Sequence, residues 1–93
     1  MLDLPEVVKN VSIDPSLLHV DVRVYLVASQ YLDDLTFRPL KLATIAITLG
    51  LGRSYVHGAF RRLCEQGYIE RGPRVSVRGP VTYRLTPYLV ALG

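Results

Sequence analysis

Two glycines, Gly50 and Gly52, stand directly before a segment with helical periodicity, and such a pair could belong to a phosphate-binding loop. A dinucleotide-binding loop requires a third glycine, in the pattern G-x-G-x-x-G, between a strand and a helix. Here the third position is Tyr55, the residues before Gly50 have a helical pattern, and no Gly-Lys-Ser/Thr signature of a P-loop is present. The pair therefore indicates a turn between two helices.

Other chemistry-bearing residues form no constellation. Cys64 is the single cysteine, so it can neither close an internal disulfide nor supply the thiolates of a structural zinc site. Asp33 and Asp34 are adjacent acids at the expected end of a helix, with no positioned nucleophile or base nearby in sequence. We expect no metal, no cofactor and no catalytic activity, which would make the chain something other than an enzyme.

Charge is divided unevenly along the 93 residues, whose net charge is +3. Residues 1–40 hold three basic and six acidic side chains, a net charge of −3, whereas residues 41–93 hold eight basic and two acidic ones, a net charge of +6. A strongly basic half favours a polyanionic partner. The length suits one small domain.

Targeting and membrane signals are missing from the sequence. Asp21, Arg23 and Gln30 interrupt the most apolar segment, and the acidic start MLDLPEVVKN lacks the basic region of a signal peptide. We expect a cytoplasmic protein that does not enter the membrane.

The first half of the chain predicts an N-terminal arm over residues 1–13 and one long helix over residues 14–35. Asp14 is a favourable N-cap, and Pro15 is tolerated at the first helical position. The expected core stripe consists of Leu17, Val20, Val24, Val27, Tyr31 and Leu35. Further apolar residues widen this stripe, so part of the helix is expected to face a second copy of the chain.

Residues 40–66 predict two helices separated by the glycine turn. The first ends at Gly50, a residue suited to the left-handed conformation that follows a helix. The second, from Arg53 to Gln66, is capped by Gly67, and its core stripe would be Val56, Ala59, Phe60 and Leu63.

Residues 67–86 alternate in polarity and are rich in β-branched and aromatic types, which predicts a two-stranded ribbon. Thr86-Pro87 then favours a short terminal helix over residues 87–93. The fold class expected is α+β and mostly helical.

This order of elements resembles the winged helix-turn-helix domains of bacterial and archaeal regulators and of plasmid or phage replication proteins. The resemblance extends from about Asp14 to Pro87. The matching residues are Ile45-Ala46, Leu49-Gly50-Leu51, Arg53-Ser54, Phe60 with Leu63, Gly67-Tyr68-Ile69 and Arg84-Leu85-Thr86-Pro87. The resemblance implies a three-helix core, a β-hairpin wing and binding to double-stranded DNA.

If the helix that starts at Arg53 enters a major groove, its N-terminal residues reach base edges. The wing arginines would clamp phosphates or enter a minor groove. The candidate DNA-binding residues are Lys41, Arg53, Ser54, Tyr55, His57, Gly58, Arg61, Arg62, Arg74 and Arg78. For Arg62, an intramolecular partner such as Glu65 or Glu70 is an equal alternative to phosphate.

The function expected is sequence-specific binding of double-stranded DNA by a small transcriptional regulator. It would act as a homodimer through the first helix and the C-terminal segment. Two alternatives stay open: the DNA-binding domain of a replication initiator, and a winged helix that serves only as a protein-interaction module.

Overall fold

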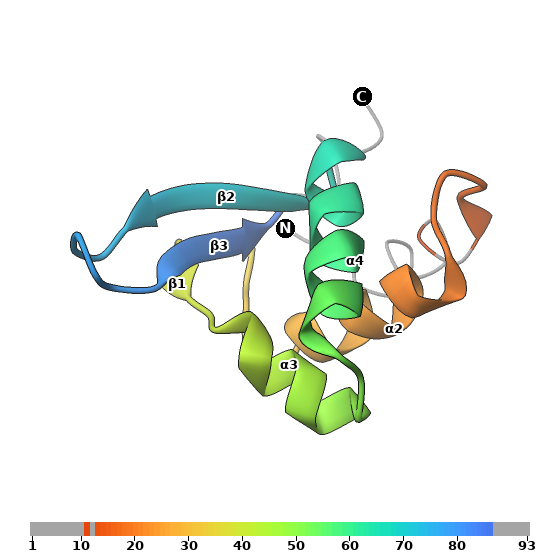
Figure 1. Ribbon diagram of the computed structural model, residues 1–93. Helices are drawn as coiled ribbons and strands as arrows, with labels where there is room; N and C mark the ends of the chain where they lie inside the picture. Colours follow the sequence, from red (N-terminus) through yellow and green to blue (C-terminus); the bar gives the residue numbers. More distant parts are fainter. Residues whose placement is uncertain (1–10, 12, 87–93) are drawn as a thin grey trace.

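The computed structural model describes residue 11 and residues 13–86, which form three helices and a three-stranded antiparallel sheet (Figure 1). The α+β class expected from the sequence is therefore confirmed. The elements are α2 (His19–Ala28), β1 (Arg38–Pro39), α3 (Leu42–Leu49), α4 (Arg53–Glu65), β2 (Ile69–Arg74) and β3 (Val81–Leu85).

Helices α3 and α4 form where the sequence predicts them. Gly50 follows α3 with a φ of 67°, and Gly67, just after α4, has a φ of 85°, a region in which a side chain would be strained. The four residues of the predicted core stripe of α4 are all buried. The positions of the glycines and the spacing of the apolar residues are thus sufficient to predict where α3 and α4 lie.

Helix α2 is shorter than predicted and does not begin at Asp14. The Asp14 carboxylate accepts the backbone N–H of Ser16 at 2.8 Å and closes a separate turn, after which Leu18 is extended at φ −95° and ψ 165°. Asp21 then accepts the N–H of Leu18 at 2.9 Å, as the third residue of a capped helix does. Asp14 therefore stabilises the preceding turn, and Asp21 determines where the helix begins.

The end of α2 also differs from the prediction, because the chain leaves the helix at Ala28. Asp33 organises the connection that follows, since its carboxylate accepts the N–H groups of Leu35 and Thr36 and pairs with Arg38 at 2.9 Å. Among the last predicted core residues, Tyr31 and Leu35 are consequently exposed.

The sheet has one strand more than the predicted ribbon. Its order is β1-β3-β2, with Arg38 opposite Tyr83 on one side and Arg71 opposite Tyr83 on the other. The two residues of β1 lie in the segment that was expected to be a connector. Such a short strand carries no periodic signal of its own.

The hairpin formed by β2 and β3 is irregular between Arg71 and Arg74, where the register shifts. Pro73, within this interval, has no N–H group to donate to β3. Its carbonyl accepts a hydrogen bond from the hydroxyl of Thr82 at 2.6 Å. Beyond this point the hairpin extends away from the helices (Figure 1).

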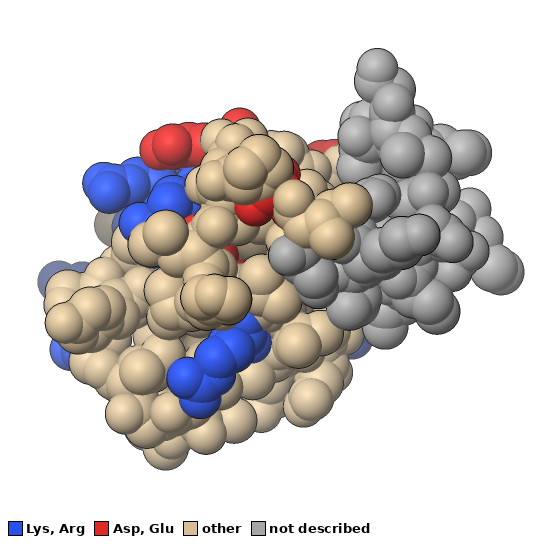
Figure 2. Space-filling model, turned by 90° about the vertical axis from the view of Figure 1, so that its right-hand side faces the viewer, with Lys and Arg blue, Asp and Glu red and all other residues tan. Residues whose placement is uncertain are grey.

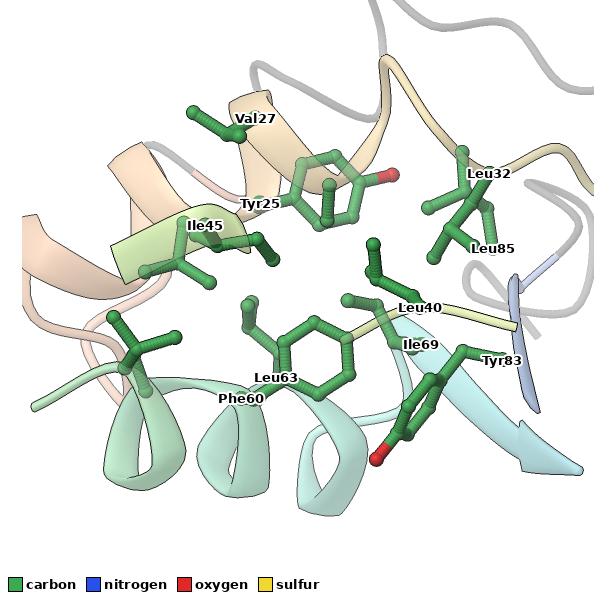
Figure 3. Close-up of a cluster of buried hydrophobic side chains, with 14 of the residues drawn as sticks. Tyr25, Val27, Leu32, Leu40, Ile45, Phe60, Leu63, Ile69, Tyr83 and Leu85 are labelled. Atoms are coloured by element: carbon green, nitrogen blue, oxygen red, sulfur yellow. The ribbon is translucent and has the colours of Figure 1, made fainter. Parts of the chain in front are cut away.

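One core joins the helices to the base of the sheet (Figure 3). Phe60 of α4 meets Tyr83 of β3 edge to face, with ring centroids 4.6 Å apart. Tyr25 of α2 contacts Tyr68 in a similar way at 6.1 Å. These contacts attach α4 to the sheet, and α2 to the short segment between α4 and β2.

Two expectations lie outside the described residues: most of the N-terminal arm and the terminal helix over 87–93. Within the described ranges, no helix has the length and apolar character needed to cross a membrane.

Candidate nucleic-acid interface

The exposed face of α4 carries three potential contact residues in one row. Arg53, His57 and Arg61 follow one another at intervals of four residues, so they lie on the same side of the helix. All three are exposed, and Arg61 pairs with Glu65 only at 3.8 Å. With 13 residues, α4 is about 20 Å long, a length that suits a DNA groove.

This row borders a groove between α4 and the sheet, which we call the α4–sheet groove. It consists of two hollows of about 490 and 430 Å³ that share Leu42, His57, Arg71 and Tyr83. No acidic side chain of the described residues lines either hollow. The basic residues that line them are Lys41, Arg53, Arg61, Arg71 and Arg74.

Lys41 occupies the N-cap position of α3, where its extended backbone precedes the first helical turn. Its side chain is exposed and borders the groove together with Arg53 and Arg74. The start of α3 and the β2–β3 hairpin therefore add positive charge to the α4–sheet groove, which α4 also borders.

The hairpin tip holds the remaining two predicted arginines. Arg74 donates from Nη1 to the carbonyl of Gly79 at 3.2 Å, across the loop, and Arg78 is exposed. The tip is closed by the N–H of Gly79, which donates to the carbonyl of Ser76 at 3.1 Å. The hydrogen bond to Gly79 thus holds the Arg74 side chain, which lines the groove, whereas Arg78 lies at the exposed end of the hairpin.

Arg62, another of the predicted contact residues, forms an ion pair with an acidic side chain of α2. Its guanidinium donates from Nε and Nη2 to the two carboxylate oxygens of Asp21, at 2.7 and 2.8 Å. The pair raises the pKa of Arg62. Neither Glu65 nor Glu70, the partners considered from the sequence, forms this bidentate contact, because the true partner is 41 positions away on α2.

Ser54, Tyr55 and Gly58 lie toward the other flank of α4. All three line a third hollow, which is shared with α2, and Ser54 and Gly58 also border the α4–sheet groove. The exposed surface of α4 therefore has a basic side toward the sheet and a more apolar side toward α2.

Arg71 was missed as a site residue. It is exposed on β2 and lines both hollows of the groove. Alternation along the predicted ribbon could have placed it on the polar face of the sheet. Its position beside α4, however, depends on how the sheet packs against the helix.

Cys64 and Tyr83 line the groove as neutral groups. Burial raises the pKa of the Cys64 thiol, and the nearby Arg71 opposes this shift. Burial likewise raises the pKa of Tyr83. The described residues contain no group of three or more His, Cys, Asp or Glu side chains placed to hold a metal.

Comparisons with known proteins give a likeness in fold. The sequence matches no protein-family model, and a search of curated proteins returns no match. The fold is similar to that of RV1404 from Mycobacterium tuberculosis, known from its crystal structure, with a TM-score of 0.62 and 24% sequence identity. The match covers 89% of this chain but 54% of that chain, so this chain spans about half of its length.

Proposed function

We propose that this chain is a winged-helix domain that binds double-stranded DNA, with α4 in the major groove and the β2–β3 hairpin as the wing. The observation that carries the proposal is the α4–sheet groove, where five basic side chains from three elements converge and no acidic side chain of the described residues is part of the lining. Such a surface matches the regular phosphates that flank a DNA groove.

The contacts would be divided between sequence reading and anchoring. Arg53, His57 and Arg61 form one row along α4, and an arginine in the major groove can donate two hydrogen bonds to guanine. Lys41, Arg71 and Arg74 lie on neighbouring elements and would contact the backbone, fixing the helix in register. Arg78, in the tip of the wing, would enter the adjacent minor groove.

We further propose that the protein is a transcriptional regulator that acts as a homodimer. Leu26 on α2, and Tyr31 and Leu35 in the connection from α2 to β1, keep 40%, 46% and 78% of their surface exposed. These apolar side chains would contact a second copy. Two copies would place two α4 helices on successive half-sites of a symmetric operator.

The proposal is tested by titrating the full chain into a labelled mixed-sequence duplex at several salt concentrations. Binding through the groove predicts that the logarithm of affinity falls linearly with the logarithm of salt, by about 0.9 for each neutralised phosphate. A matched single strand should bind more weakly. Failure to bind duplex DNA even at low salt would reject the proposal and favour a protein-interaction module.

A further inference from the structure

A hollow on the opposite flank of α4 has the properties of a ligand site. It has a volume of about 600 Å³, within the range of pockets that hold small molecules. It lies between α2, α4 and the turn before α4, and we call it the α2–α4 hollow. Its lining consists of Leu18, His19, Val20, Arg23, Leu51, Ser54, Tyr55, Gly58 and Arg62.

The walls of this hollow are apolar side chains left in contact with water. Leu18 and Tyr55 keep 56% and 67% of their surface exposed, although leucine is among the residue types most often buried. Figure 2 shows the α2 side of the molecule, where residues other than Lys, Arg, Asp and Glu make up most of the surface that the described residues form. Gly58 is a further lining residue, and a Cβ there would make an ordinary contact of 3.5 Å with Arg62 Nη1.

The charge of the hollow is positive. Arg62 is neutralised by Asp21, whereas Arg23 has no ion-pair partner among the residues that the structure describes. No acidic side chain lines the hollow within the same ranges. Apolar walls beside an uncompensated guanidinium complement a ligand with an apolar body and an anionic head.

We propose that the α2–α4 hollow binds a small amphipathic organic anion, with its ring or chain against Leu18 and Tyr55 and its anionic group on Arg23. A second part rests on the proposed DNA-binding function: the bound anion weakens DNA binding. The reason is that Ser54 and Gly58 line both the hollow and the α4–sheet groove. An occupant would also contact Leu18 and Arg62, the two residues that bind the Asp21 carboxylate.

The site is tested without DNA, by fluorescence titration with anilinonaphthalene sulfonate and with its neutral counterpart phenylnaphthylamine. Leu18→Ser removes an apolar wall but places a favourable residue at the N-cap of α2, so the fold should persist. It should weaken binding of both probes about tenfold, as expected for losing contact with one leucine. Ile47→Ser is the control, because Ile47 is 82% exposed on α3 and lies outside the hollow.

Arg23→Gln tests the contact with the anionic head separately from the contacts with the apolar body. It should weaken the sulfonate about threefold to fivefold, as for an exposed ion pair, and leave the neutral probe unchanged. If Leu18→Ser and Ile47→Ser change the probe affinity equally, the proposed site is wrong. An unchanged sulfonate affinity in Arg23→Gln would overturn its assignment to anions.

The competition is tested by adding saturating sulfonate probe to the complex of the wild-type chain with duplex DNA. Weaker DNA binding in the wild type but not in Leu18→Ser supports the coupling. Unchanged DNA affinity in the wild type overturns it, while the titrations without DNA still decide the site. A wild type that binds the probe but no duplex would reject the proposed function separately.

Discussion

Asp21 of α2 and Arg62 of α4 form a bidentate ion pair, with Nε–Oδ2 and Nη2–Oδ1 distances of 2.7 and 2.8 Å. The carboxylate is completely buried, whereas the arginine side chain keeps 30% of its surface exposed. The same carboxylate accepts the N–H of Leu18 at 2.9 Å. One buried charge therefore caps α2 and fixes it to the helix proposed to contact DNA.

The first prediction concerns the cost of breaking this pair. Arg62→Leu leaves the Asp21 carboxylate buried without its cation and should lower the free energy of unfolding by about 3 to 5 kcal/mol. Arg61→Leu is the matched control, since its pair with Glu65 is exposed and should contribute less than about 1 kcal/mol. Urea unfolding measures both.

A double variant sharpens this test. Asp21→Leu combined with Arg62→Leu removes both charges, so part of the lost stability should return. Equal stabilities of Arg62→Leu and Arg61→Leu would show that the buried pair does not stabilise the fold.

The second prediction concerns pH and the hydrogen bond that Tyr68 Oη donates to Asp14 Oδ2 at 2.7 Å. This bond, followed by the N–H of Ser16, holds the pKa of Asp14 below its ordinary value of 3.8. A depressed pKa in the folded state stabilises the fold above the unfolded pKa. That contribution is lost as the pH falls below about 4 and through the folded value.

Tyr68→Phe should therefore raise the pKa of Asp14 toward its ordinary value and flatten the loss of stability in acid. Carboxyl carbon shifts followed by NMR give the pKa. Asp33 is an internal control, because backbone N–H groups of Thr36 and Leu35 lower its pKa independently of Tyr68. An unchanged Asp14 titration in the variant would contradict the assigned cause.

The third prediction compares two glycines. A Cβ at Gly72 would lie 2.5 Å from Thr82 Oγ1 and closer still to the ring of Phe37, so Gly72→Ala should cost about 1 to 3 kcal/mol. At Gly58 the nearest atom would be Arg62 Nη1, at an ordinary 3.5 Å. Gly58→Ala should therefore stabilise the middle of α4 by about 1 kcal/mol. Thermal unfolding of the two variants should show opposite shifts.

The fourth prediction concerns the proposed dimer. Replacing Leu26 and Leu35 by serine should shift the protein from dimer to monomer, because Leu26 is exposed on α2 and Leu35 is exposed in the connection between α2 and β1. Ile47→Ser, on α3, serves as the control for losing an exposed apolar residue. Sedimentation velocity distinguishes the states, and a wild type that sediments as a monomer would remove the dimer from the proposal.

The parts of the fold that were predictable are those with local signals. Gly50 and Gly67 mark helix ends through their backbone conformation, and the stripe of α4 follows from periodicity alone. The start of α2 was predicted wrongly because Asp14 and Asp21 are both capable caps. The choice between them depends on burial of Asp21 beside Arg62, which is a tertiary contact.

The candidate site was predictable to a similar extent. The exposed row on α4 follows from the same periodicity, whereas the roles of Arg62 and Arg71 do not. Arg62 pairs with Asp21, which is 41 residues away in the sequence. Arg71 lines the groove because β2 packs beside α4. Both facts depend on long-range packing.

Removing single cations inside and outside the α4–sheet groove tests whether DNA binds there. Arg61→Gln and Arg71→Gln remove groove cations, whereas Arg38→Gln removes an exposed cation on β1 that is paired with Asp33 outside the groove. Fluorescence anisotropy with one duplex of a few helical turns, over a range of salt, gives an affinity and a salt slope for each. We predict that each groove variant weakens binding, that Arg71→Gln lowers the slope by about one, and that Arg38→Gln matches the wild type. Equal losses in all three variants, or none in the groove variants, would contradict the claim.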